Sequence, residues 1–538
     1  MLDWRPDLDP TTPGNLTYVN NMMPTERGYM GWHYPTAQTS AQLTLQANES
    51  PITCLYATRW LSVPGGICIA GTNKDLYVYD YTNGFIKVSI AGGYALTGAT
   101  YQYGEDATTS FDMCSFGDVL IATHKSTFPQ YRSALDLTIG TLFANLGTSI
   151  AAPKASVCAV SSNFVFLGDI NSTWGTVTSV AGTRDMVCWS KIGDHQNWDV
   201  DPAVTQGSYA VFNDTPGPVT ALAPLADGIV VFKAQATYLG RYVGAGPNSP
   251  IWDFVRISDR IGCIGHRSVT NIGGQLVFVG AEDIYIYDGA SLPKPITKGI
   301  WQTEIQGNTN VGGIRPMWVG HDQFNGCVIF TRSDSTGYWL MWSYRHNRWS
   351  ALSVYGEGAL TGVNGVGADP ICFAKSNTND FRKVTSTTFS GTVNSDHTDV
   401  YTMFATNVEA SGGFPSKCQI FNRFNTNTAW STVATIGSAA FGHDDNVTKI
   451  SRVIPKWGGG PTAATLRQDT KASLAVDWTV TGAEVSMNSR YRFDMQAAGG
   501  TAANWHRFML KLTNHAGAEI IELKPEFEST AVTPLGRK

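Results

Sequence analysis

The chain of 538 residues is predicted to be an all-β protein built around a β-propeller of about six blades. Few stretches of ten or more residues space their apolar residues as a helix does, whereas short apolar runs bounded by Gly, Asn, Asp and Pro occur throughout. An apolar strand also recurs at intervals of about 45 to 65 residues, with room for four short strands in each interval. Units of four short strands are typical of propellers.

The first forty residues (1–40) are expected to form an extended N-terminal arm, because they are dense in Pro, Asn and Thr and show no apolar period. Residues 41–47 alternate between apolar and polar side chains, which predicts a strand with one buried face. Propellers usually close their ring with one blade that takes a strand from each end of the repeat region. Residues 42–46 are our candidate for that closing strand.

The propeller is assigned to residues 41–355. Its most regular strand is a continuous apolar run, as expected for a strand buried on both faces between neighbouring blades. This run recurs at 67–70, 119–122, 164–167, 229–232, 276–279 and 327–330. Aromatic-rich strands are expected at 76–79, 238–242, 284–287 and 340–344, and Trp-bearing strands at 197–200, 251–254 and 348–352. Their large side chains would fill the widening gap between blades; a set of unrelated hairpins in β-sandwiches is the alternative.

The repeat fades after about Tyr355. Residues 356–455 are expected to be a β-rich insertion or connecting region, since short strands alternate there with clusters of Gly, Ser, Asn and Thr. Residues 456–538 open on a Gly-rich turn and then contain several strand-like runs. They are predicted to be a C-terminal β-sandwich-like region, either a separate domain or extra strands packed on the propeller.

The composition is poor in charge, with 15% charged and 43% hydrophobic residues, and it excludes disorder for most of the chain. The 38 basic and 43 acidic residues give a net charge of −5, which argues against a dedicated nucleic-acid binder. Sparse charge is typical of surfaces that lie against partners. Because blade packing accounts for many aromatic residues, we expect the arm and the region after Tyr355 to hold neighbouring subunits together.

Membrane and secretion signals are not visible. No run approaches the ~18 apolar residues of a membrane helix, and residues 1–7 lack the basic and apolar segments of a secretory leader. The nine cysteines are scattered, odd in number and free of Cys-x-x-Cys spacing. We therefore expect buried thiols in a chain folded in a reducing compartment, with no disulfide framework.

No catalytic, cofactor-binding or metal-ligating residues are predicted, and we expect no enzyme. P-loop, His-Glu-x-x-His, Gly-x-Ser-x-Gly and EF-hand patterns are missing from the sequence. The weaker candidates are interpreted as turns, solvated loops or ordinary strands. They are Asp7 and Asp9 (calcium-loop start), 356–361 (dinucleotide-like turn), 333–339 (one sialidase-like box), Glu282 and Asp283 (carboxylates), His195, His321 and His346 (loop histidines), Asn15 and Asn171 (sequons), and 489–493 and 505–508 (basic-aromatic runs).

Several stretches together resemble structural tail proteins of short-tailed bacteriophages. The resemblance covers roughly residues 1–300 and rests on 7–14, 21–29, 229–233 with 238 and 241–244, 261–269, and 279–280 with 283–289. Within that group the sequence is most similar to tail nozzle proteins, which are related to tail tubular protein B and to packaged-DNA stabilisation proteins.

The resemblance implies a propeller protomer in a homohexameric ring of the virion tail, assembled in the cytoplasm of the bacterial host. Such a ring extends the DNA-ejection channel below the portal and the adaptor (head-completion) protein, retains or guides the genome, and carries fibres or spikes. DNA would pass without sequence recognition, and the slight acidity of the chain would discourage sticking. The family offers no cofactor and no catalytic residue to carry over. The alternatives are another phage tail hub or receptor-binding propeller, or a carbohydrate-active propeller enzyme.

Overall fold

In a computed structural model of the chain, every element with described bounds is a β-strand, which confirms the all-β prediction. The described residues are 3–9, 11–12, 14–31, 36–43, 54–59, 66–71, 75–80, 84–88, 111–133, 143–147, 150–175, 179–201, 206–244, 251–297, 299–301, 305, 317, 319–322, 325–330, 338–353, 372–373, 381–382, 400–406, 416–422, 434–438, 440–442, 449–459, 463–471, 479–480, 484–495, 503–513 and 519–528.

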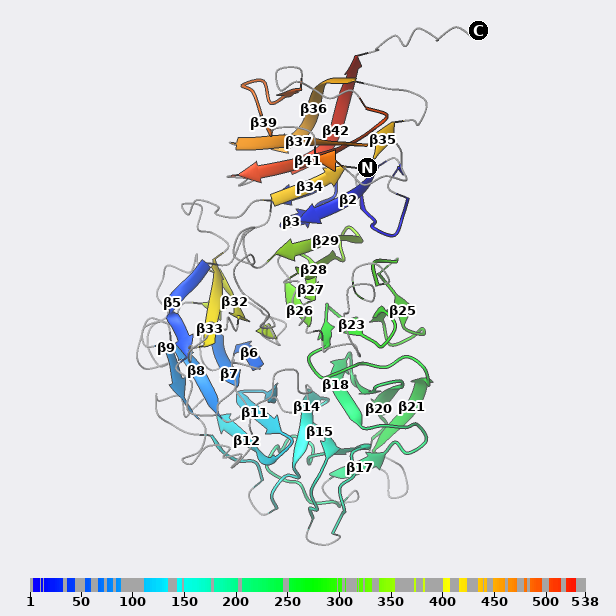
Figure 1. Cartoon of the computed structure of the whole chain (residues 1–538). Coiled ribbons are helices and arrows are strands. Elements are labelled where there is room, and N and C mark those ends of the chain that lie inside the picture. The colour runs from blue at the N-terminus through cyan, green and yellow to red at the C-terminus, as the bar shows by residue number, and fades with distance from the viewer. Residues whose placement is uncertain are drawn as a thin grey trace.

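The region between residues 54 and 353 is a succession of four-stranded antiparallel sheets, each made of four consecutive strands. Five of these sheets are separate, and the sixth forms one end of a 12-stranded sheet. They follow one another in an arc (Figure 1). The first three comprise β6 (Cys54–Arg59), β7 (Gly66–Gly71), β8 (Leu76–Asp80) and β9 (Gly84–Lys87); β10 (Asp112–Phe116), β11 (Val119–His124), β12 (Thr127–Ser133) and β13 (Ala144–Asn145); and β14 (Ala155–Ser161), β15 (Phe164–Ile170), β16 (Met186–Trp189) and β17 (Ser208–Val211).

The fourth to sixth sheets have the same order. They comprise β18 (Val219–Leu225), β19 (Gly228–Lys233), β20 (Thr237–Tyr242) and β21 (Trp252–Ser258); β22 (Val269–Asn271), β23 (Leu276–Val279), β24 (Ile284–Tyr287) and β25 (Lys294–Pro295); and β26 (Val319–Asp322), β27 (Cys327–Phe330), β28 (Tyr338–Ser343) and β29 (Arg348–Ser353). The second strand of each sheet contains the apolar run identified in the sequence. Along β15, β19, β23 and β27 every residue is buried, as a strand covered on both faces requires.

Aromatic side chains fill the space between neighbouring sheets. Phe166 of the third sheet meets Trp252 of the fourth edge-to-face, with ring centroids 4.9 Å apart. Phe212, which follows β17, lies 5.2 Å from Phe254 of β21 in the same geometry. Edge-to-face pairs of this kind add stability beyond the apolar area that they bury.

One predicted outer strand is wrong. Residues 197–200 were expected to form the Trp-bearing strand of the third sheet, but they lie outside any strand, and β17 takes that position. The Asp194 and Asn197 side chains cap a turn there, by accepting the backbone N–H groups of Gln196 and Asp199. The buried Trp198 indole donates to the carbonyl of His195, so its burial does not need a strand.

The candidate closing strand pairs as part of an antiparallel sheet of five strands. β5 (Thr36–Leu43) begins before the predicted residues 42–46, and its partner is β33 (Ser416–Asn422). The sheet β30–β32–β33–β5 therefore joins a strand that precedes the six sheets to strands that follow them. Its other members are β30 (Cys372–Phe373), β31 (Phe381–Arg382) and β32 (Val400–Thr406). β30 contacts β6 and β5 contacts β9, so this sheet lies beside the first of the six.

Within the predicted N-terminal arm, residues 3–31 form four short strands that belong to the sheets of the molecule. β1 (Asp3–Trp4) pairs with β2 (Asn15–Asn20), and β2 pairs with β34 (Ala434–Ser438). β3 (Met22–Pro24) pairs with β4 (Tyr29–Gly31), and β4 pairs with β42 (Glu519–Glu528). Leu16, Val19, Met22 and Tyr29 are fully buried. Strands of two to six residues are too short to show an apolar period, which explains the arm-like appearance of the sequence.

The C-terminal strands complete two larger sheets above the arc (Figure 1). One is the 12-stranded sheet, in which β2 connects β29 to β34, β41 and β37; the other is the five-stranded sheet β3–β4–β42–β36–β40. The remaining strands are β35 (Phe441–Gly442), β36 (Lys449–Gly459), β37 (Ala463–Lys471), β38 (Thr479–Val480), β39 (Val485–Ser486), β40 (Phe493–Asp494) and β41 (Trp505–Thr513). One hydrophobic cluster runs from Trp349 through Leu466 and Phe508 to Ile520. The predicted divisions at residues 355 and 455 remain predictions.

Tyr29 joins the N-terminal strands to the sixth sheet. Its buried hydroxyl accepts the backbone N–H of Trp4 at 3.0 Å and donates to the carbonyl of Trp349 at 3.0 Å. Close by, the Arg348 guanidinium donates to the carbonyl of Thr25 at 2.9 Å. These contacts connect positions more than 300 residues apart in the sequence.

The variant Tyr29→Phe should lower the free energy of unfolding by about 2 kcal/mol, because it leaves a buried N–H and a buried carbonyl without this partner. Urea unfolding followed by tryptophan fluorescence measures the loss. Tyr209→Phe, which removes a hydroxyl from a side chain that is 39% exposed, is the matched control and should change stability little. Equal effects of the two substitutions would contradict this role of Tyr29.

Candidate functional site

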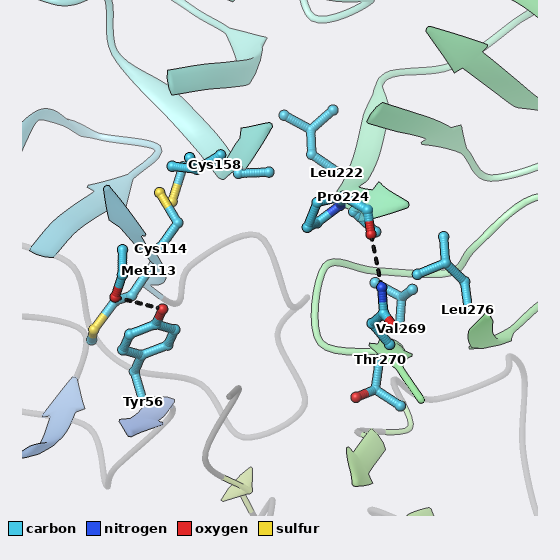
Figure 2. A pocket seen from close by; sticks show the side chains of 14 residues that line it. Tyr56, Met113, Cys114, Cys158, Leu222, Pro224, Val269, Thr270 and Leu276 are labelled. Carbon is cyan, nitrogen blue, oxygen red and sulfur yellow. Dashed lines mark hydrogen bonds between the residues drawn. The ribbon is translucent and has the colours of Figure 1, made fainter. Parts of the chain in front are cut away.

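The candidate functional site is a cavity of about 260 Å³ where the first strands of the sheets converge. Figure 2 shows side chains from five consecutive sheets around it. The lining residues are Tyr56, Met113, Cys114, Ser115, Cys158, Ala159, Val160, Leu222, Ala223, Pro224, Val269, Thr270, Asn271 and Leu276. All but Leu276 lie on a first strand, namely β6, β10, β14, β18 or β22, so the cavity exists only when these sheets are assembled.

First strands of successive sheets contact one another from β10 through β14, β18 and β22 to β26. Side-chain hydrogen bonds reinforce these contacts. Asn271 of β22 donates to the carbonyl of Pro224 in β18 at 3.0 Å. Thr220 of β18 donates at 2.7 Å to the carbonyl of Cys263, which lies on the connection to the fifth sheet. Strand contacts and side-chain hydrogen bonds therefore connect the cavity walls across neighbouring sheets.

The polar end of the cavity consists of two hydroxyl groups. The Tyr56 and Ser115 oxygens are 2.9 Å apart and form a hydrogen bond between β6 and β10. Burial raises the pKa of Tyr56 above its usual value, although the bond to Ser115 works in the opposite direction. Tyr56 is consequently a neutral phenol at physiological pH, able to donate and to accept hydrogen bonds.

Sulfur atoms form one wall of the cavity. Met113 and Cys114 come from β10 and Cys158 from β14, and Figure 2 shows all three on the side of Tyr56, opposite Leu222. The buried Asp112 carboxylate orders this wall by accepting the backbone N–H groups of Met113 and Cys158, each at 3.0 Å. The two thiols are held on adjacent strands.

Arg267 closes the centre of the arc at the end opposite the cavity. This buried side chain precedes β22 in the fifth sheet and donates to the carbonyl of Phe111, which precedes β10 in the second. The third and fourth sheets lie between these two in the sheet order, so the bond spans the centre at the start of the first strands. The cavity lies further along the same strands, with residues such as Ser115 and Asn271 in its lining. It is a half-open pocket at the centre of the described sheets.

The chemistry available in this cavity is limited. Its fourteen lining residues, drawn in Figure 2, include no carboxylate, imidazole, ammonium or guanidinium group. General acid–base catalysis most often uses one of these groups, and the titratable groups of this lining are the Tyr56 phenol and the Cys114 and Cys158 thiols. The uncharged lining is suited to binding an uncharged group.

Lys233 is a second buried polar centre, and it lies at the junction of the third and fourth sheets. Its ammonium group donates to the carbonyls of Phe212 and Thr215 on the connection between β17 and β18. Burial lowers the pKa of Lys233, while Asp185 and Asp214 oppose that shift. The Tyr238 hydroxyl lies 2.6 Å from Thr215 Oγ1, and burial raises the pKa of Tyr238 to about 12. This arrangement fixes the connection between the two sheets.

The calcium-like start of the sequence is a local turn. Arg5 forms an ion pair with Asp7 at 2.8 Å. Asp9 accepts hydrogen bonds from the backbone and the hydroxyl of Thr11 at 2.8 and 2.5 Å. Both carboxylates thus have partners within the turn. Across the described part of the chain, no group of three or more His, Cys, Asp or Glu side chains is arranged to hold a metal ion.

Glu282 and Asp283 lie in different environments although they are adjacent in the sequence. Glu282 is exposed. Asp283 is partly buried and accepts hydrogen bonds from the Thr297 hydroxyl at 2.7 Å and from the backbone N–H of Ile284 at 2.6 Å. Burial raises the pKa of Asp283, and these hydrogen bonds partly offset the shift. Its role is to hold the turn between β23 and β24 against the end of β25.

The three candidate histidines lie in three different settings. His195 packs between the rings of Phe116 and Tyr131, at 5.7 and 5.2 Å, and burial lowers its pKa. His346 is in the turn between β28 and β29, and burial lowers its pKa as well. His321, expected in a loop, lies in β26, and its Nε2 is 3.1 Å from the Tyr344 hydroxyl. That part of the prediction is wrong.

The basic-aromatic run at 505–508 is part of β41. His506 and Phe508 are buried, and His506 Nδ1 is 2.8 Å from the amide of Gln468. Arg507 lies on the opposite face, where it shares the buried Asp469 carboxylate with Arg467, at 2.8 and 2.9 Å. The arginine points toward a carboxylate of the same sheet, as an ordinary strand residue does.

The other basic-aromatic run, at 489–493, is a turn followed by the start of β40. The Asn488 side chain holds this turn by accepting the backbone N–H groups of Arg490 and Arg492, at 2.9 and 3.1 Å. Tyr491 is 50% exposed, whereas Phe493 is fully buried.

The remaining candidates divide between buried, exposed and undescribed positions. The Asn15 side chain is buried and accepts the backbone N–H of Arg5, whereas Asn171 is exposed and donates to the carbonyl of Lys125. The dinucleotide-like turn at 356–361 lies outside the described residues, as does the sialidase-like box at 333–339 except for the backbone of its last two residues in β28. Six cysteines, namely Cys54, Cys114, Cys158, Cys188, Cys263 and Cys327, are buried thiols.

Sequence reasoning missed the groups that define the cavity. Tyr56 and the cavity cysteines lie in ordinary apolar strand patterns, and nothing in the sequence distinguishes them from core residues. Arg267 was part of the family resemblance, but its position across the arc depends on pairing between distant sheets. A charged residue directly before a predicted first strand is the one signal that could have singled it out.

Comparisons with known proteins identify no family. No family model matches the chain, and no curated protein matches it. Among solved structures, the crystal structure of the computationally designed Ika8 protein is similar over 71% of this chain and 100% of its own, with a TM-score of 0.34 and 11% identity. This similarity is too low to carry an argument about fold or function. No helix within the described residues has the length and hydropathy needed to cross a membrane.

The ionisation of Asp283 predicts a pH dependence. Its pKa is higher in the folded protein than in the unfolded chain, so the folded state binds the proton more tightly. The protein therefore loses stability as the pH rises from the pKa of the unfolded chain to that of the folded protein. The stability of the wild type relative to Asp283→Asn should therefore fall as the pH rises above the ordinary pKa of an aspartate carboxyl, as measured by urea unfolding. The same measurement on Glu282→Gln, which removes an exposed carboxylate, is the control. A difference for Asp283→Asn that rises with pH would contradict this assignment.

Proposed function

We propose that the chain is a structural subunit of a bacteriophage tail, a nozzle protomer that assembles into a homohexameric ring and extends the DNA-ejection channel. The observation that carries the proposal is the sequence resemblance to tail nozzle proteins. Parts of its stretches fall on strands of one framework: 22–24 and 29 on β3 and β4, 229–233, 238 and 241–242 on β19 and β20, and 269, 279 and 284–287 on the fifth sheet. The stretches at 7–14 and 261–268 lie on connections outside the strands, as far as these residues are described.

In this proposal the six sheets from β6 to β29 are blades of a propeller. Their four-stranded order, the contacts between consecutive first strands and the buried second strands all support this interpretation. The sheet that joins β5 to β33 lies beside the first blade and would close the ring with strands from both sides of the repeat. Of the expected closing strand at 42–46, residues 42 and 43 belong to β5, and residues 44–46 lie outside the described residues.

The proposed channel lies between subunits and not within one. Arg267 crosses the centre of the sheets to the carbonyl of Phe111, so a duplex cannot thread a single protomer. A ring of protomers is then the arrangement that supplies a bore wide enough for DNA, and closed rings are the usual outcome of repeated head-to-tail contacts. The adaptor, the tail fibres or spikes and the transiting genome are the partners that this role implies, in the virion and without enzymatic activity.

Negative-stain electron microscopy of the purified full-length chain over a range of concentrations tests the proposal. We expect closed rings with six-fold symmetry and an axial bore. Glycan-array binding and glycoside-hydrolysis assays on the same preparation address the receptor-binding and carbohydrate-active alternatives. Compact particles without a bore, together with saturable glycan binding or hydrolysis, would contradict the nozzle proposal and favour the receptor-binding or the carbohydrate-active alternative.

A further inference from the structure

The first strands surround a half-open cavity of about 260 Å³ at the centre of the protomer. Close-packed protein interiors have few voids larger than a water molecule. An engineered apolar cavity of roughly 150 Å³ in another protein is large enough to hold benzene. The present cavity is larger, so a molecule with one or two fused rings fits its volume.

The charge of the lining determines which ligands it excludes. None of the fourteen lining side chains is charged. The Asp112 carboxylate lies behind the sulfur wall, where it is occupied by the backbone N–H groups of Met113 and Cys158. Transferring an unpaired ion into such a site costs several kcal/mol, so the occupant must be neutral.

The walls favour an aromatic ring. Met113, Cys114 and Cys158 present sulfur atoms on one side, and Leu222, Val269 and Leu276 present aliphatic carbon on the other (Figure 2). Sulfur atoms are polarizable and make favourable contacts with aromatic rings. A flat ring between these two walls gains sulfur contacts on one face and aliphatic packing on the other.

The polar end of the cavity favours one hydrogen-bonding group on that ring. The Tyr56 hydroxyl, bonded to Ser115 at 2.9 Å, has an oxygen that can also accept a hydrogen bond from a ligand N–H or O–H group. The Asn271 side chain is less suited to this role, because its amide nitrogen donates to Pro224 and its oxygen accepts from Gly273 and Gly274. Tyr56 and Thr270 are the remaining hydroxyl side chains of the lining beside Ser115, and Tyr56, on the side of the sulfur wall, is the group that we expect to orient the ligand.

We propose that this half-open cavity is a binding site for a small, uncharged aromatic molecule that carries a single N–H or O–H group, in the size range from phenol to indole. The ring lies between the sulfur wall and the aliphatic wall, with its polar group toward Tyr56. Arg267 closes the opposite end of the centre, so the ligand enters from the side at which the first strands end. This inference does not depend on the tail function.

Isothermal titration of the full-length chain with indole, phenol, toluene and benzoate tests the site. We expect saturable binding of indole and phenol, with benzoate at least tenfold weaker because it is charged. Tyr56→Phe keeps the ring but removes the hydroxyl, and should weaken phenol about fivefold to tenfold, the effect of one hydrogen bond, while leaving toluene unchanged. Tyr209→Phe is the matched control and should change neither.

A second variant, Ala223→Leu, tests the site independently in case Tyr56→Phe does not fold. Ala223→Leu fills the cavity from β18 and should abolish binding of all three neutral compounds, provided that circular dichroism shows a folded chain. If Ala223→Leu does not fold, the proposal is tested by the ratio of phenol affinity to toluene affinity in Tyr56→Phe, which should be lower than in the wild type. Failure of the folded wild type to bind indole or phenol would overturn the proposal. Undiminished binding to a folded Ala223→Leu variant, or an unchanged affinity ratio in Tyr56→Phe, would do so as well.

Discussion

The two-sided burial of the second strands constrains the whole arrangement of this protein. A strand such as β15 or β19, in which every residue is buried, needs apolar cover on both faces of its sheet. One sheet cannot provide that cover for itself, so each sheet must lie between two neighbours. The hydrophobic cluster shared by the third and fourth sheets, with Phe166 against Trp252, shows how the cover is supplied. Each added sheet covers one face of the sheet before it. The first and last sheets of the series therefore need other strands of the chain to cover their outer faces.

The two ends of the series are covered in different ways. Beside the first sheet lies the antiparallel sheet in which β5 pairs with β33. At the sixth sheet, β29 continues through β2 into the C-terminal strands, and Tyr29 and Arg348 bond the N-terminal strands to it. Residues 3–31 are therefore an internal part of the fold. Leu16, Val19, Met22 and Tyr29 of this segment are buried by contacts within the chain.

The centre of the sheets is also asymmetric. At the start of the first strands Arg267 reaches the carbonyl of Phe111, and the guanidinium fills the middle. Further along the same strands the small side chains of Ala159 and Ala223 leave a cavity with an uncharged lining. One end of the centre thus stabilises the assembly of sheets, while the other retains space for a ligand. Both features place the proposed DNA channel outside the single protomer.

The sequence by itself determined the all-β class and the positions of most second strands, because a continuous apolar run between turn residues is a local property. It also located β20, β21, β24 and β29 closely. It misplaced the outer strand at 197–200, where side-chain caps and a buried Trp198 produce a turn with strand-like composition.

Only the tertiary structure decided the contacts between distant segments. The pairing of β2 with β34, the position of Arg267 beside Phe111, and the meeting of Tyr56 with Ser115 each depend on how whole sheets stack. The cavity belongs to the same class of features, because five strands must converge before it exists. Short strands carry too few residues to encode their partners locally. Their pairing is therefore selected by the burial that the complete assembly provides.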